Sequence, residues 1–265
     1  MKATQAIIMI LLTVSSAGAR LSPLAPQPDW SRLEAFQETI TRKDFLALLE
    51  KVYAPAGAWK ETITVHEEMA LISTRPDRQP FLLRFAPSRE SAKPVPRYWR
   101  SRQQLPPEEP GKPLAGLRIA LDPGHIGGDW ARMEQRWFQI GDFPPVTEGD
   151  MTLTVAQLLT PRLEALGAEV FLTRDSAAPA ISLGVDQLTS LAAESLGEKG
   201  ILSDEESLRK ESERLFYRVA EIRRRATLVN EIIRPDMVVC LHFNAEAWGD
   251  PNNPQLVDEN HLHFL

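Results

Sequence analysis

Two histidines and one glutamate occupy positions from which they could hold a metal ion together. His125 follows the apolar run 117–122 (LRIALD) through a Pro-Gly turn, and His242 lies near the end of a second apolar run, 236–243 (DMVVCLHF). Such runs are typical of buried parallel strands, and the second run, apolar on both faces, is expected to be a central strand. Open α/β sheets bind ligands at the carboxyl ends of their strands. Glu148 begins the helix that we predict after the first strand, and a helix start faces the same edge of the sheet. The three side chains could therefore converge, although they are far apart in the sequence.

Two imidazoles and one carboxylate are the ligands of a catalytic zinc (Zn²⁺) centre whose fourth position holds water. Zinc would lower the pKa of that water toward ~7 and polarise a carbonyl oxygen, so the pattern predicts hydrolysis rather than redox chemistry. Glu134 is nearer to His125 in the sequence and is an alternative ligand, but Thr147 and Asp150 favour Glu148 because they place it at a helix start. The spacing alone leaves open that the histidines are hydrogen-bonded core residues.

Other sources of catalysis have less support. The sequence contains no G-x-S-x-G motif and no P-loop, and the run 66–70 (HEEMA) fails the H-E-x-x-H zinc pattern at its last position. The single cysteine, Cys240, excludes multi-cysteine metal motifs and is expected to pack inside an apolar strand. The arginine run 223–225 is expected on the solvated face of a charged helix. Four aromatic residues could line a groove or cover the sheet: Trp130, Trp137, Phe138 and Phe143.

The elements around these residues alternate between strands and helices. We predict strands at residues 117–122, 168–173 and 236–243. One helix begins at Glu148, contains Pro161 and ends at Gly167, and a longer helix begins at Ser203 and continues to Ile233. This alternation is typical of an α/β fold with right-handed crossovers.

The N-terminal part of the chain has a different organisation. Residues 1–19 combine an early lysine, a short apolar run and an Ala-Gly-Ala cleavage pattern, so we predict a secretory signal peptide and an exported protein of the periplasm or cell envelope. Residues 20–86 are predicted to be a small α+β module of unknown role, with a helix capped by Thr41 and Asp44. Residues 87–113 contain seven prolines and are predicted to be an extended linker with few contacts to either side.

Composition narrows the functional classes. The net charge of −6 gives no argument for a nucleic-acid partner, and no segment after the signal peptide is apolar and long enough to cross a membrane. The oligomeric state is not indicated by the sequence.

Five short motifs occur in order within residues 114–265: LDPGHIGG, E-x-x-x-x-L, G-x-x-V-x-L-T-R, R-x-x-x-x-N and LHFNA. Together they resemble the zinc-dependent N-acetylmuramoyl-L-alanine amidases of the amidase 3 family. The sequence departs from that family where Ile126 separates His125 from the Gly-Gly pair, and in two longer segments, 125–148 and 174–225.

The resemblance implies a mainly parallel, twisted sheet with helices on both faces. It implies peptidoglycan as partner, and hydrolysis by a zinc-activated water of the amide between N-acetylmuramic acid and L-alanine. It assigns His125, Glu148 and His242 as zinc ligands, and Asn244 and Arg174 as candidate substrate-binding residues.

The family's catalytic glutamate is expected beyond Leu265, because neither Glu246 nor Glu259 is at the matching place. The chain as given is therefore expected to lack the final catalytic residue and to be inactive on peptidoglycan. Two alternatives remain open. One is a non-catalytic peptidoglycan-binding or regulatory protein that retains the amidase fold, and the other is a zinc hydrolase of a different exported amide.

Overall fold

The computed structural model describes residues 24–25, 28–74, 78–107, 109–243, 250 and 252–253. The predicted signal peptide and Asn244 lie outside the described residues. The chain divides into two compact units, residues 1–96 and 97–265, within the segment predicted to be a linker. None of the helices in the described part of the chain has the length and hydropathy that a membrane span requires.

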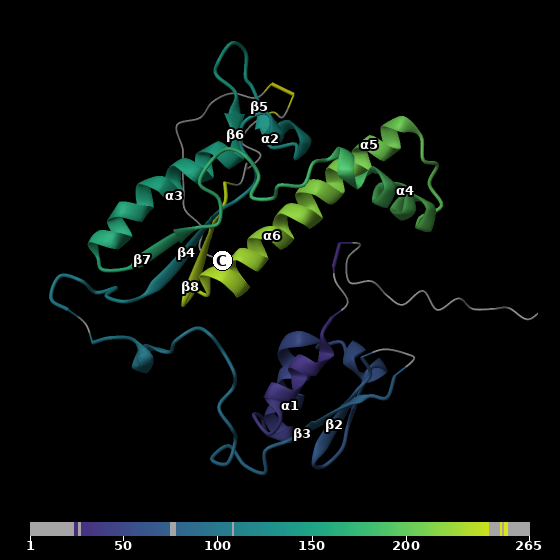
Figure 1. Ribbon diagram of the computed structural model, residues 1–265, viewed down its shortest axis with the longest axis vertical. Coiled ribbons are helices and arrows are strands. Elements are labelled where there is room, and N and C mark those ends of the chain that lie inside the picture. Colours follow the sequence, from purple (N-terminus) through teal and green to yellow (C-terminus); the bar gives the residue numbers. More distant parts are fainter. Residues whose placement is uncertain are drawn as a thin grey trace, which may run out of the picture. The chain divides into compact units, whose positions relative to one another are not determined.

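The first unit is a small antiparallel sheet with a short helix, as the sequence predicts (Figure 1). Its strands β1 (Ile63–Val65), β2 (Met69–Ile72) and β3 (Phe81–Arg84) pair in that order. Helix α1 (Arg42–Leu48) begins at Thr41, whose hydroxyl oxygen accepts a hydrogen bond from the Asp44 N–H, as in a helix cap. Phe45 of this helix packs on Phe85 with ring centroids 5.3 Å apart, which joins helix and sheet in one core. Helical turns flank α1: η1 (Trp30–Phe36), η2 (Leu49–Tyr53) and η3 (Ala58–Glu61).

The second unit has the predicted α/β fold, built on a parallel sheet of three described strands. Strand β4 (Arg118–Pro123) lies between β7 (Glu169–Leu172) and β8 (Met237–Leu241), and it pairs with both in parallel. The expectation that residues 236–243 form a central strand is wrong for the described sheet, because β4 takes that place and β8 lies at an edge. Its apolar residues are therefore partly uncovered, and Met237 and Val238 are exposed.

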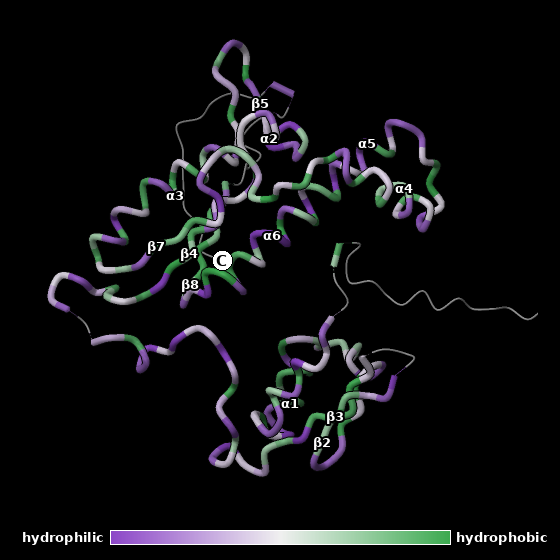
Figure 2. The backbone as a smooth tube through the Cα atoms, in the orientation of Figure 1, coloured by the Kyte–Doolittle hydropathy of each residue, from purple (hydrophilic) through white to green (hydrophobic). Residues whose placement is uncertain are grey.

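Helices cover the two faces of this sheet. Helix α3 (Glu148–Ala165) packs Ala156 against Ile119 and Leu121 on one face, contains Pro161 and is followed by Gly167 at φ +97°. Toward the other face runs a continuous helical rod made of α5 (Glu205–Arg214), η6 (Leu215–Glu221), α6 (Ile222–Thr227) and η7 (Leu228–Ile233). Asp204 rather than Ser203 caps it, because the Asp204 carboxylate accepts the Ser207 N–H. Figure 2 shows the contrast between the hydrophobic strand β8 and the hydrophilic helix α5.

Residues 176–202, which have no clear sequence pattern, contain η5 (Asp186–Leu188) and helix α4 (Thr189–Glu198). Helix α4 packs on α5 through the buried Glu211 carboxylate, which accepts hydrogen bonds from Ser195 and Lys199. The segment of the chain between β4 and α3 contains helix α2 (Trp130–Met133) and two paired strands, β5 (Trp137–Phe138) and β6 (Val146–Thr147). Trp130 stacks on Phe216 of the helical rod, whereas Phe138 and Phe143 are exposed.

The proline-rich segment 87–113 makes more contacts than its composition predicts. On the side of the first unit, Arg89 pairs with Asp44. On the side of the second unit, just before η4 (Arg102–Gln104), Arg100 pairs with the buried carboxylate of Asp236. Bidentate pairing of this kind fixes the backbone around Arg100 to the start of β8.

Candidate metal centre

His125, Glu148 and His242 converge at the carboxyl edge of the parallel sheet, where their positions after strands and at a helix start predict them. Each offers one ligand atom, and these atoms all lie within 4.8 Å of one another. Glu148 Oε1 is 3.4 Å from His125 Nε2 and 3.3 Å from His242 Nδ1. Nitrogen and oxygen ligands of a tetrahedral zinc ion, at bond lengths of about 2.0–2.2 Å, are separated by roughly 3.4 Å. The residues present therefore fit a three-ligand metal site of the kind that zinc occupies.

A close approach of two turns places His125 beside His242. The Gly124 N–H donates to the Leu241 carbonyl over 2.9 Å, and a Cβ at position 124 would lie 2.5 Å from both that oxygen and His242 Cε1. Only glycine fits there. The chain then turns through His125 at φ +59°, and the two imidazole rings meet edge to face with centroids 5.1 Å apart.

Glu148 is the first residue of α3, and the start of this helix packs directly on the turn after His125. A Cβ at Gly149 would lie 2.2 Å from the Ile126 carbonyl oxygen, so the two backbones are in contact. The Thr152 hydroxyl donates to the Gly124 carbonyl over 2.7 Å and ties the first turn of α3 to β4. Glu148 Oε1 also accepts the Phe243 N–H over 3.0 Å. The Glu148 carboxylate is therefore held by contacts with the residues that follow β4 and with the residues that follow β8.

Glu134, the alternative ligand, contacts the opposite edge of the His125 ring. Its Oε2 is 2.9 Å from His125 Nδ1 and 3.1 Å from the Ile126 nitrogen, and its side chain is 5% exposed. The convergent ligand atoms come from Glu148 instead, on the Nε2 side of the ring.

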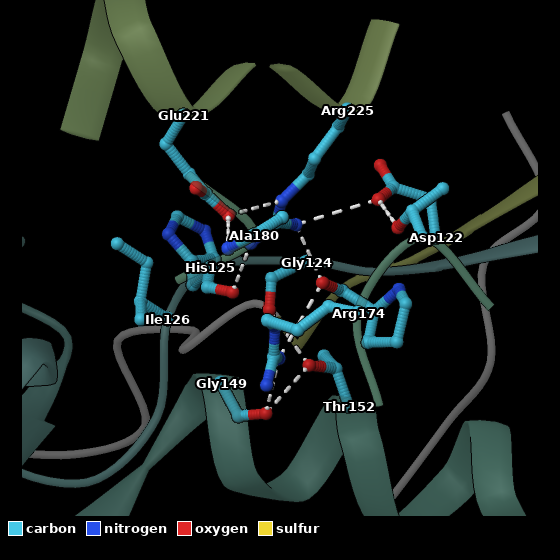
Figure 3. A network of polar contacts seen from close by, with 12 residues as sticks. Asp122, Gly124, His125, Ile126, Gly149, Thr152, Arg174, Ala180, Glu221 and Arg225 are labelled. Carbon is cyan, nitrogen blue, oxygen red and sulfur yellow. Dashed lines mark hydrogen bonds and ion pairs between the residues drawn. The ribbon is translucent and has the colours of Figure 1, made fainter. Parts of the chain in front are cut away.

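A buried ion-pair network holds the backbone of the His125 turn from the other side, as Figure 3 shows. Arg225 pairs with Glu221 over 2.8 Å and donates to the carbonyl oxygens of Pro123 and His125, each over 2.6 Å. It also lies 3.4 Å from Asp122. The expectation that Arg225 is on a solvated face is therefore wrong, because it is 7% exposed. Glu221 lies four residues before Arg225, and this spacing in the sequence could have predicted their intrahelical ion pair.

Arg174 lies inside the fold. It is 3% exposed, and its guanidinium donates to the carbonyl oxygen of Gly149 over 2.8 Å and to that of Ser176. Burial, and then the like charge of Arg225, lowers the pKa of Arg174 below its usual value. These contacts place Arg174 beneath the start of α3, and its role in substrate binding stays a prediction.

A cavity of about 740 Å³ lies beside His125 and His242, between the sheet and the helical rod. Its walls include His125, Glu134 and His242 on the sheet side, and Tyr217 and Arg218 on the rod. Cys240 also faces it and is exposed, so the expectation that this cysteine packs within the strand is wrong. Because His242 is 49% exposed, the metal cluster is accessible from solvent.

Comparison with known proteins gives one distant likeness. No family model and no solved structure matches the chain. The N-acetylmuramoyl-L-alanine amidase CwlM of Mycobacterium tuberculosis is 33% identical over 105 residues, covering 35% of this chain and 25% of that protein. The matched part thus spans a quarter of the relative's length, and it supports a distant amidase relationship.

Proposed function

We propose that residues 114–265 form a zinc-dependent N-acetylmuramoyl-L-alanine amidase domain. It hydrolyses the amide between N-acetylmuramic acid and the L-alanine of the peptidoglycan stem peptide. The observation that carries the proposal is the convergence of His125, Glu148 and His242 at the edge of the sheet. The partial likeness to CwlM supports the same reaction class.

In this function, zinc would be held by His125 Nε2, Glu148 Oε1 and His242 Nδ1. When bound, zinc supplies an activated water and polarises the scissile carbonyl. The backbone contacts of Glu148 and Gly124 hold these ligands in place before metal arrives, which favours a fixed geometry over an induced one. The adjacent cavity gives the substrate access to the cluster.

Amide hydrolysis also needs a group that gives a proton to the leaving amine. Glu148 is committed to the metal and Glu134 to the His125 ring, so neither carboxylate is free for that task. The amidase 3 proteins that the motifs resemble take this proton carrier from a later segment.

The test combines metal content with product analysis. The full-length natural polypeptide should hold about one zinc ion per chain, and His125→Ala and His242→Ala should each lose it, because two ligands make a poor site. The exposed His66, in the first unit, provides the matched control, and His66→Ala should keep the metal. Purified sacculi that are incubated with the protein should release stem peptides whose L-alanine carries a free amine.

Two results would overturn this function. Stoichiometric zinc in the double variant of His125 and His242 would refute the metal site. Tight binding to sacculi with zinc present but without new L-alanine amines would instead favour the non-catalytic peptidoglycan-binding alternative.

We also propose export to the periplasm or cell envelope, supported only by the signal-peptide pattern of residues 1–19. N-terminal sequencing of protein taken from cells should begin at Arg20. Recovery of the intact N-terminus from the cytoplasm would contradict export.

A further inference from the structure

Glu134 is a buried carboxylate whose contacts all point to one neighbouring turn. Its Oε2 lies 2.9 Å from His125 Nδ1 and accepts the Ile126 N–H over 3.1 Å, while its side chain is 5% exposed. Within the part of the chain that the structure describes, its ion-pair partner is His125, and no lysine or arginine pairs with it. A buried carboxylate is expensive unless its partners satisfy it, so this placement requires the imidazole.

The two contacts of Oε2 decide which nitrogen of His125 carries the proton. The Ile126 N–H donates to Oε2, and a carboxylate oxygen has no proton of its own to give, so its 2.9 Å contact with His125 Nδ1 is satisfied when Nδ1 carries the proton. The other ring nitrogen, Nε2, then presents its lone pair toward Glu148 Oε1, 3.4 Å away. Two acceptors that face each other at this distance repel unless a cation lies between them.

We propose that Glu134 is a positioning residue that holds His125 in the Nδ1–H tautomer and aims Nε2 at the metal position. This inference rests on the proposed zinc site and adds a residue that acts on a ligand without binding the metal. A carboxylate behind a ligating histidine orients the ring and raises its basicity, and loss of such a partner typically weakens metal binding by about 10–100-fold.

The first measurement is made on the metal-free protein. The imidazole nitrogen chemical shifts of neutral His125 should show a protonated Nδ1 in the wild type. Glu134→Ala should move the ring toward the Nε2–H form, which is the usual preference of a free imidazole. Glu134→Gln keeps an acceptor oxygen, so it should retain much of the Nδ1–H form.

The second measurement is zinc affinity by competition with a chelator. Glu134→Ala should still bind about one zinc ion but about 10–100-fold more weakly, and Glu134→Gln should lose less. Glu211→Gln is the matched control, because Glu211 is also a buried carboxylate but lies in the α4–α5 pair. Its zinc affinity and its His125 shifts should equal those of the wild type.

Each outcome decides the proposal. Unchanged zinc affinity and an unchanged tautomer in Glu134→Ala overturn it. Complete loss of zinc in Glu134→Ala, together with full retention in Glu148→Ala, also overturns it, because Glu134 would then be a ligand. If the wild type binds no zinc, the proposed function fails, yet the tautomer of the metal-free protein still tests the role of Glu134.

Discussion

The strongest stability prediction concerns Arg225, whose guanidinium joins the helical rod to the turn at His125. Arg225→Met keeps most of the aliphatic stem but removes the charge. It leaves Glu221, which is 1% exposed, without its cation, and it removes the Arg225 donor from the His125 carbonyl and the shorter of two hydrogen bonds to the Pro123 carbonyl. Removal of one partner from a buried ion pair costs about 3–5 kcal/mol. We expect the free energy of unfolding of the second unit to fall by that amount.

The assay must distinguish the two compact units, since a chain of more than one unit need not unfold in a single two-state transition. Hydrogen exchange in rising urea, followed on peptides from β4 and α3, reports the second unit alone. Arg224→Met is the matched control, because Arg224 is the adjacent residue and makes no ion pair among the described residues. Its effect should stay within about 0.5 kcal/mol.

Equal and small effects of the two substitutions would refute the reasoning. They would mean that Arg225 is solvated in solution, and that the backbone of the His125 turn does not depend on it. A loss in Arg225→Met that disappears in the background Glu221→Gln would instead identify the unpaired carboxylate as the source of the cost.

Three further predictions follow from single contacts. Hydrogen bonds from Arg214, Lys199 and Ser195 lower the pKa of Glu211 from 4.5 to about 2, and Arg214 has the largest effect. The contribution of Glu211 to the stability of the fold is therefore present above pH 4.5 and is lost as the pH falls toward 2. Hydrogen exchange of α4 should show this acid sensitivity, and Glu211→Gln should remove it. Gly149→Ala brings a Cβ to 2.2 Å from the Ile126 carbonyl oxygen. It should destabilise the second unit by about 1–3 kcal/mol, as measured by urea unfolding, and it should weaken zinc binding, as measured by chelator competition. Arg100→Ala should speed chymotryptic cleavage of residues 98–113 in a digestion time course, because the guanidinium pair with Asp236 is lost and only the backbone N–H bond remains. Equal rates in both proteins would contradict that anchor.

Local patterns in the sequence were sufficient for the strands of the parallel sheet, for α3 and the helical rod, and for the three residues that converge at the sheet edge. Apolar runs of strand length, the Pro-Gly turn after β4 and the helix start at Glu148 each depend on neighbouring residues. For that reason they predicted the α/β fold of the second unit and the small α+β fold of the first. The convergence of His125, Glu148 and His242 followed from a topological rule, that strand ends and helix starts share one edge of a parallel sheet.

Pairing and burial between distant segments could not be predicted in the same way. The three arginines at 223–225 look alike in the sequence, and only the contact of the helical rod with the β4 turn distinguishes Arg225 by burying it. Likewise, the strand order β7-β4-β8 puts β8 at the described edge and exposes Cys240, although the apolar run predicts a central strand. Glu134 was the alternative ligand, nearer to His125 in the sequence, and its place behind the His125 ring depends on the path of the intervening loop. Residue type and spacing therefore determined which groups could do chemistry, whereas tertiary packing decided the partner and the burial of each one.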